Sequence, residues 1–380
     1  MNAEVKSPAD HIVPAPSRAL IARTAAIVSR GLRDLARDSN WLVRKVFAGK
    51  SDRIAVSPDG QVCGFFGSGA QTTEHLWICY AESTASQAVL TIPREPTLPA
   101  AGLPARFSFS PTARRLVVAW EGWPKQFHVF DLQARGFLGA FGGFESAPEA
   151  MAWSERGTYF AAAVREADES RLKLWRTPRE PQTGMPFGDA AETELRSSEQ
   201  LEGLAAGGDG NDADGGELAG FGSMAFRPDD RVLAAVACME GEWADDAILL
   251  LDVPGLKHRE TIHAQGRVTS LGWAHAGGYL TFCAAGQCYR IAKGSAEPET
   301  LPFGAEICAC HPHLPLCLGF SSWLKNSAKG RLFVADVKSL TIVDECAAEG
   351  VVDLRWSVDG SKAYAVTSDG LAYIYDPPLL

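Results

Sequence analysis

The residues with the clearest potential for chemistry are the three cysteines and two histidines of CACHPHLPLC, Cys308 to Cys317. Thiolate and imidazole are ligands that zinc prefers, so this composition suggests a metal site. However, Cys308 and Cys310 occupy positions that hold mainly large apolar residues in six similar segments of the chain, given below. We therefore interpret the cysteines as core residues, and we expect His311 and His313 to lie in a solvated turn.

A second segment with metal-binding composition is GGDGNDADG, Gly207 to Gly215. It has the pattern of one calcium-binding nonapeptide, but Asp214 takes the apolar position, and a single copy cannot form the stacked turns between which such ions lie. A flexible acidic loop is the default interpretation. The chain also has no nucleophile elbow and no zinc-protease motif. The sequence therefore predicts no catalytic residue, no cofactor and no obligate metal.

The elements that position these residues are clearest in the last unit of the chain, LRWSVDGSKAYAVTSDGLAYIYD, Leu354 to Asp376. Three short runs of alternating apolar and polar residues are separated by two turns that end in Asp-Gly, the strongest local signal for a β-hairpin. We expect a three-stranded antiparallel meander. Its first strand recurs as IAVSPDG, FSFSPTA, MAWSERG, MAFRPDD, LGWAHAG, CACHPHL and LRWSVDG, which begin at Ile54, Phe107, Met151, Met224, Leu271, Cys308 and Leu354.

Neighbouring copies are separated by 53, 44, 73, 47, 37 and 46 residues, close to the roughly 40–45 residues of a four-stranded propeller blade. A second apolar run follows each copy, and four of these runs end in aspartate: Asp131, Asp252, Asp336 and Asp376. The pattern resembles the WD40-repeat family over about Asn40 to Asp376. It is a degenerate resemblance, since the chain has no Trp-Asp and no Gly-His pair. The resemblance implies an all-β fold, a seven-bladed WD40-like β-propeller.

The same resemblance suggests how the ring closes. The last unit has only three strands, whereas WLVRKVF, Trp41 to Phe47, precedes the first copy as an unassigned β-run. Added to the last blade, this run would be its outer strand, as in the velcro closure of WD40 proteins, and no long sheet edge would remain unpaired.

The repeats predict one folded domain over residues 40–380. Residues 1–39 are expected to be a disordered start followed by a helix. Residues 178–222 form an acidic insertion that lengthens one interval to 73 residues, and its composition predicts a mostly disordered loop. The fourth strand of the third blade must lie within it, and we expect it near Glu194 to Leu204.

Composition limits the compartment and the partners. The net charge is −10, and residues 181–220 hold nine carboxylates and one arginine, so the remainder is close to neutral and nucleic acid is disfavoured as a partner. No apolar segment approaches a membrane span, and the first residues do not read as a secretion signal. Nine cysteines without paired spacing indicate reduced thiols. We expect an intracellular, cytoplasmic protein.

The predicted N-terminal helix covers about residues 17–37 and is amphipathic. One face carries Leu20, Ile27 and similar residues, and the other includes Arg23, Arg30 and Arg33. Such a helix can pack on protein, lie on a membrane surface or act as a targeting segment. Packing on the propeller or on a neighbouring subunit is the favoured interpretation, and membrane contact through this helix is the alternative.

Four tryptophans are candidate partner contacts: Trp120, Trp123, Trp243 and Trp323. All lie in or beside predicted hairpins between second and third strands, and in WD40-like rings these hairpins lie on the partner-binding face. A large rigid ring buries much area at small entropic cost, as an interface contact must. The alternative is that each ring folds back onto its own blade.

These observations favour a non-catalytic scaffold or adaptor subunit that binds other protein subunits within a larger assembly. The first alternative is an enzyme or small-ligand binder that uses the central channel, because groups brought together from several blades leave no linear motif. The second alternative is a peripheral membrane protein held by the Arg-rich helix.

Overall fold

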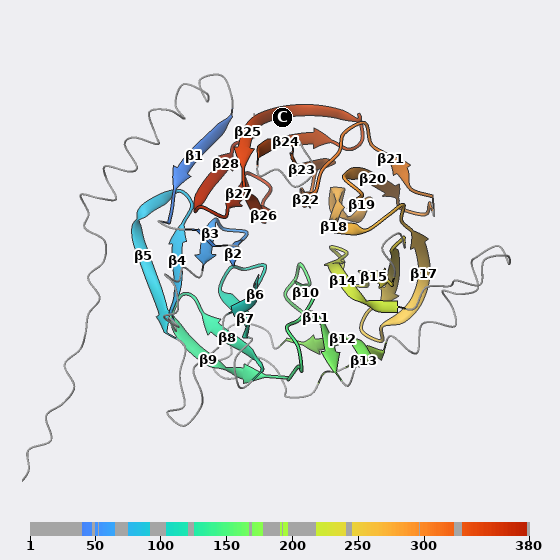
Figure 1. The fold of residues 1–380 in the computed structure, drawn as a ribbon, viewed down its shortest axis with the longest axis horizontal. Coiled ribbons are helices and arrows are strands. Elements are labelled where there is room, and N and C mark those ends of the chain that lie inside the picture. The colour runs from blue at the N-terminus through green and yellow to red at the C-terminus, as the bar shows by residue number, and fades with distance from the viewer. Residues whose placement is uncertain are drawn as a thin grey trace, which may run out of the picture.

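The computed structural model of the chain describes residues 40–47, 50–51, 53–64, 75–91, 104–120, 125–166, 169–177, 191, 193–196, 218–240, 245–295, 297–322 and 329–377. These residues form seven four-stranded antiparallel sheets, arranged as blades around a central axis (Figure 1). All seven segments predicted as first strands form the innermost strand of a blade. The predicted seven-bladed propeller is therefore confirmed.

The strands are as follows. Blade 1 contains β2 (Ile54–Val56), β3 (Gln61–Gly64), β4 (His75–Tyr80) and β5 (Ser83–Thr91); blade 2, β6 (Pro104–Phe109), β7 (Arg115–Trp120), β8 (Phe127–Asp131) and β9 (Gly136–Phe141); blade 3, β10 (Ala150–Trp153), β11 (Tyr159–Glu166), β12 (Glu169–Arg176) and β13 (Thr193–Arg196); blade 4, β14 (Leu218–Phe226), β15 (Val232–Met239), β16 (Ala247–Asp252) and β17 (Lys257–His263). Blade 5 contains β18 (Val268–Ala274), β19 (Tyr279–Ala284), β20 (Gln287–Ala292) and β21 (Glu299–Thr300); blade 6, β22 (Ile307–Cys310), β23 (Leu316–Ser322), β24 (Lys329–Asp336) and β25 (Thr341–Glu349); blade 7, β26 (Val351–Trp356), β27 (Ala363–Thr367), β28 (Leu371–Tyr375) and β1 (Trp41–Lys45).

Ring closure occurs as predicted. Strand β1 is the outer strand of blade 7 and pairs antiparallel with β28, from Trp41 opposite Tyr375 to Lys45 opposite Leu371. The pairing continues beyond the strand, since the amide of Val46 donates to the carbonyl of Gly370 at 2.9 Å. The two ends of the described chain are therefore joined in one sheet.

The buried side chains form seven clusters, and each cluster lies between two neighbouring blades. Strand β15 shows why: Leu233 and Ala235 face blade 3, whereas Ala234 and Val236 face blade 5. Because successive side chains of a strand point to opposite faces, one apolar strand contributes to two interfaces. Each blade therefore depends on both of its neighbours.

Two parts of the predicted insertion are ordered strands. The fourth strand of blade 3 is β13, Thr193–Arg196, which overlaps the start of the segment where we expected it. Strand β14 begins at Leu218, so the predicted boundary at residue 222 is too late. The buried side chains of Leu218 and Phe221 give the physical reason, because they pack into the interface with blade 3. The predicted N-terminal helix lies outside the described residues.

The closing strand offers a direct test of this architecture. Trp41 is buried, and its ring centroid lies 4.9 Å from that of Tyr375, whereas the neighbouring Leu42 is 46% exposed. We expect Trp41→Ala to lower the free energy of unfolding in urea by about 3–5 kcal/mol. The matched control Leu42→Ala should change it by less than about 0.5 kcal/mol. Equal effects of the two substitutions would show that β1 does not close the ring.

Candidate functional site

The predicted partner-binding residues fall almost entirely outside the described residues. Trp120 is the last residue of β7. The other six predicted contacts, Trp123, Trp243, Trp323, Arg23, Arg30 and Arg33, lie in segments that the structure does not describe. The Gly207–Gly215 segment also lies outside them. These assignments therefore remain predictions.

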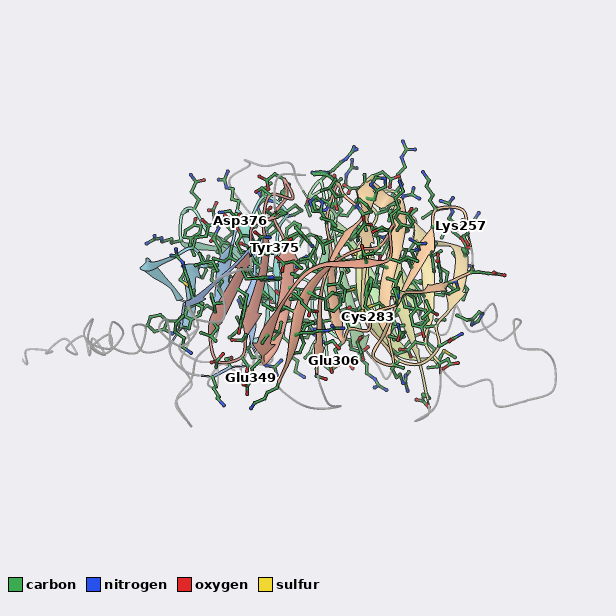
Figure 2. The ribbon with its side chains drawn as sticks, turned by 90° about the horizontal axis from the view of Figure 1, so that it is seen from above. Lys257, Cys283, Glu306, Glu349, Tyr375 and Asp376 are labelled. Atoms are coloured by element: carbon green, nitrogen blue, oxygen red, sulfur yellow. The ribbon has the colours of Figure 1, made fainter. Side chains whose placement is uncertain are left out.

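The two faces of the ring are defined by the blade topology. In an antiparallel four-stranded blade, the turns between strands one and two and between strands three and four lie at the same end. We call this end the first-turn face. Figure 2 shows it as the face with Lys257 and Asp376, opposite the face with Glu306 and Glu349. The strand ends that flank the segments with Trp123, Trp243 and Trp323, such as those of β7 and β8, lie at the opposite face.

A cavity of about 380 Å³ occupies the central channel, and its wall includes first-turn residues such as Pro58, Glu155 and Val358. Three tryptophans at equivalent positions of alternate blades border it: Trp153, Trp273 and Trp356. Each indole N–H donates to a backbone carbonyl of the preceding blade: Trp153 to Ser108 at 3.2 Å, Trp273 to Ala225 at 3.1 Å and Trp356 to Ala309 at 3.0 Å. We predicted core positions for all three. Trp356 is buried, but Trp153 and Trp273 are half-buried because they also face the channel.

Some charged side chains that line the channel form hydrogen bonds between neighbouring blades. The amide of Val56 in blade 1 donates to the Asp353 carboxylate in blade 7 at 2.8 Å. Burial raises the pKa of Asp353, and the nearby Arg355 acts in the opposite direction. Across the channel, partial loss of hydration raises the pKa of Glu155 to about 7, and the Asp230 carboxylate adds to this effect, although Glu155 as a whole is exposed to solvent. A carboxyl group that titrates near neutral pH is the channel's clearest chemical feature.

His311 corrects one prediction, because it is buried rather than solvated. Its Nδ1 accepts from the amides of His313 and Leu314 at 2.9 Å, and its Nε2 lies 3.1 Å from the carbonyl of Gly360 in blade 7. This pattern requires the neutral tautomer with hydrogen on Nε2. In four other blades a buried serine hydroxyl occupies the position and accepts from the turn in the same way. His313 is exposed, as predicted.

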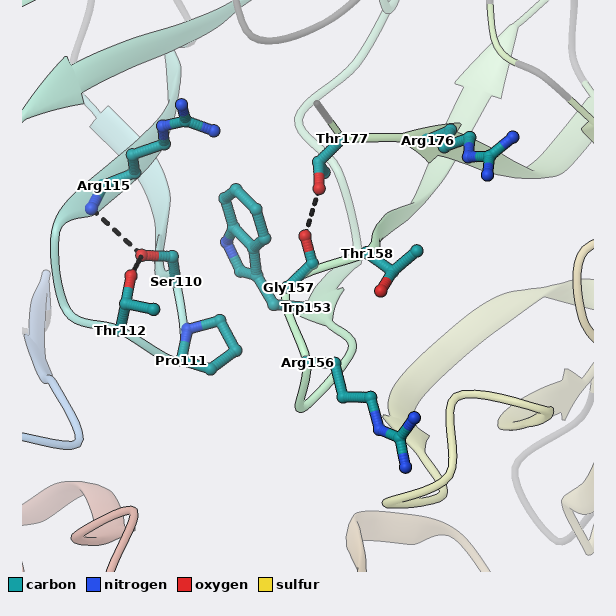
Figure 3. Close-up of a pocket in the computed structure, with 10 residues that line it drawn as sticks. All are labelled: Ser110, Pro111, Thr112, Arg115, Trp153, Arg156, Gly157, Thr158, Arg176 and Thr177. Carbon is teal, nitrogen blue, oxygen red and sulfur yellow. Dashed lines mark hydrogen bonds between the residues drawn. The ribbon is translucent and has the colours of Figure 1, made fainter. Parts of the chain in front are cut away.

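A second cavity, of about 540 Å³, lies on the first-turn face between blades 2 and 3. It is lined by Arg115, Arg156 and Arg176 together with Trp153. Figure 3 shows that the three guanidinium groups extend in different directions around the indole ring. The three arginines therefore make the cavity positively charged, but their N–H donors do not converge on one point.

Three large exposed apolar side chains lie on the first-turn face, one on each of three consecutive blades. Leu314 of blade 6 is 37% exposed, Val358 of blade 7 is 57% exposed and Tyr80 of blade 1 is 45% exposed. We call these three residues the apolar arc. Two contacts hold its turns in place: His311 bonds to Gly360, and the Tyr364 ring packs so closely on Gly60 that a Cβ there would lie 2.9 Å from it. The arc is thus a fixed surface on a rigid support.

Five cysteines from two blades also meet, which the sequence did not predict. Cys308, Cys310 and Cys317 of blade 6 pack beside Cys283 and Cys288 of blade 5 in one core cluster. Cys308 and Cys317 are buried, which confirms their interpretation as core residues, and Cys310 is half-buried. Among the described residues, no group of three or more histidine, cysteine or acidic side chains is arranged to hold a metal ion.

No family model matches the chain, and no curated protein matches its sequence. By contrast, 1474 chains of solved structures are similar in fold. One, from the crystal structure of a mitotic checkpoint complex, has a TM-score of 0.61 and 12% identity, with 99% of this chain and 96% of that chain covered. The likeness establishes the fold, a seven-bladed WD40-like β-propeller. Because so many chains share it, the fold does not select one function.

His311 predicts a specific dependence of stability on pH. Burial lowers its pKa from 6.5 to about 4, so between these values the unfolded chain binds a proton that the folded chain does not. The stability that His311 contributes is therefore complete above pH 6.5 and is lost as the pH falls toward 4. The variant His311→Ser keeps an acceptor for the turn, as in four other blades, and removes the titration.

We expect wild type to exceed His311→Ser in free energy of unfolding by about 1–2 kcal/mol at pH 7, since one bond and the ring packing on Trp356 are lost. This difference should shrink between pH 6.5 and 4. Urea denaturation of both proteins across that range measures it. A difference that stays constant with pH would contradict the buried, neutral histidine.

Proposed function

We propose that the chain is a non-catalytic scaffold or adaptor that presents its propeller faces to other protein subunits. The apolar arc carries this proposal. Exposed apolar side chains scattered singly are ordinary, but three on consecutive blades of one face, on turns fixed by inter-blade contacts, are typical of a contact surface. Rigid turns lose little conformational freedom on binding, which favours affinity.

The similarity to a chain from a multi-protein complex supports the same class of role, although at 12% identity it does not identify a partner. We place this scaffold inside the cell, where its thiols stay reduced. No helix in the described part of the chain has the length and apolar character to cross a membrane. Membrane contact through residues 17–37 remains the alternative, which liposome flotation of the full chain tests.

The test of the apolar arc compares two identical substitutions. Val358→Asp places a charge in the arc, whereas Val343→Asp places one on β25, where Val343 is 46% exposed. We expect native affinity purification followed by light scattering to show a stoichiometric assembly for wild type and for Val343→Asp. Val358→Asp should weaken the assembly by about tenfold or more, as when a central apolar contact is lost. A 40.7 kDa monomer in wild type would contradict the scaffold.

The predicted tryptophan contacts belong to the same proposal but to the opposite face. Alanine substitutions of Trp123, Trp243 and Trp323 test whether a partner also binds there. Loss of a subunit that Val358→Asp retains would indicate two partners on two faces.

The second candidate is a small-ligand binder or enzyme that uses the channel. Its supporting observation is the Glu155 carboxyl, whose pKa of about 7 lies in the range of an acid or base that works at neutral pH. Metabolite screening against wild type and Glu155→Gln by thermal shift tests it. A ligand that stabilises wild type and not the variant would favour the channel.

A further inference from the structure

Five of the nine cysteines gather at the interface of blades 5 and 6 and contact one another through two cross-strand pairs. Cys283 of β19 lies directly opposite Cys288 of β20, and their sulfur atoms are 3.3 Å apart. Cys310 of β22 lies opposite Cys317 of β23. Cys308 stands between the two pairs and interacts with Cys283, Cys310 and Cys317.

The Cys283 and Cys288 pair has the backbone geometry of a disulfide site. The two strands are joined by Ala285 and Gly286, both with positive φ (49° and 79°), as in a two-residue hairpin of type I′. In such a hairpin the residues that flank the loop form the hydrogen-bonded pair, so the next pair outward is the non-hydrogen-bonded one, whose Cα atoms lie about 4.5 Å apart. That spacing is within the range of disulfides.

Cys308 differs from the other four thiols in its hydrogen bonding. The Ser270 hydroxyl donates to its sulfur at 3.3 Å. The neighbouring thiols of Cys283, Cys310 and Cys317, together with this hydroxyl, lower the pKa of Cys308. Proximity to Cys308 raises the pKa of Cys310 and Cys317, and proximity to Cys288 and Cys308 raises that of Cys283. Cys308 and Cys310 both border the channel cavity of about 380 Å³, whereas Cys283 and Cys288 are fully buried and Cys283 lies within the thickness of the ring (Figure 2).

We propose that this five-cysteine cluster is a site of oxidative modification, in which a hydroperoxide enters through the central channel, oxidises Cys308 first, and leaves a disulfide between Cys283 and Cys288. The cavity admits a molecule close to water in size. A thiolate is the form that reacts with peroxide, so the point of entry is Cys308, the channel-facing thiol whose sulfur accepts a hydrogen bond from the Ser270 hydroxyl.

The chemistry balances without a further reagent. The Cys308 thiolate attacks a peroxide oxygen, the O–O bond breaks and hydroxide leaves, so that sulfur is oxidised to sulfenic acid and the peroxide is reduced. The Cys283 thiol then attacks the Cys308 sulfur, an S–S bond forms, the S–O bond breaks and water leaves. Cys288 attacks the Cys283 sulfur and releases Cys308 as thiolate, the better leaving group, while the Cys288 proton neutralises the hydroxide. Two thiols and one hydrogen peroxide give one disulfide and two waters.

The experiment treats the full chain with hydrogen peroxide, alkylates the remaining thiols and maps the cysteine peptides by mass spectrometry. Wild type should acquire a Cys283 to Cys288 disulfide. In Cys283→Ser the sulfenic acid has no partner thiol at that position, so the trapping reagent dimedone should label Cys308. Cys308→Ser should form the disulfide at least about tenfold more slowly, because it removes the channel-facing thiol that accepts the Ser270 hydrogen bond and leaves the fully buried Cys283 and Cys288 without direct access to the cavity.

The matched control is Cys346→Ser, which removes a half-buried cysteine of blade 6 outside the cluster and should behave as wild type. Dimedone labelling of wild type over time provides a second measurement that needs no variant, with Cys308 labelled first. A disulfide that maps to Cys310 and Cys317, an unchanged rate in Cys308→Ser, or a native protein whose cluster stays reduced while the urea-unfolded chain oxidises would each overturn the proposal.

Discussion

The structure depends on one packing constraint: each four-stranded blade has two apolar faces, and only neighbouring blades can bury both. The seven core clusters, one at each blade interface, are the result. In a linear stack of such blades the two end faces would remain in water. Pairing β1 with β28 brings the two ends together and places the seventh cluster, which contains Val46 and Ile374, between blades 7 and 1.

This constraint also explains why polar groups of the inner strands form contacts between neighbouring blades. Tryptophan N–H groups reach back to the preceding blade, the Asp353 carboxylate accepts the Val56 amide, and His311 contacts Gly360. Many polar groups near the axis therefore hold blades in register. The turns that carry the apolar arc take part in the same way, through the contact of His311 with Gly360 and the packing of Tyr364 on Gly60.

The fold could be predicted from the sequence because propeller blades repeat locally: strand, tight turn, strand, at a nearly constant period. The closing strand could be predicted in the same way, and the predicted position of the fourth strand of blade 3 overlaps β13. Burial and contacts that depend on a neighbouring blade could not be predicted from the sequence. The burial of His311 depends on the turn of blade 7, and the exposure of Trp153 and Trp273 depends on the width of the channel. Cys283 and Cys288 are far enough from Cys308 in sequence that only stacking of blades 5 and 6 shows the five thiols as one cluster.

Hydrogen exchange of the full chain, followed by mass spectrometry, tests the central claim of a single ring closed by β1. We expect the amides of β1 and β28 to be protected as strongly as those of β11 and β12 in blade 3, because each blade depends on both of its neighbours. Rapid exchange of β1, with the remaining blades still protected, would contradict it and would show an open stack with a loosely attached strand.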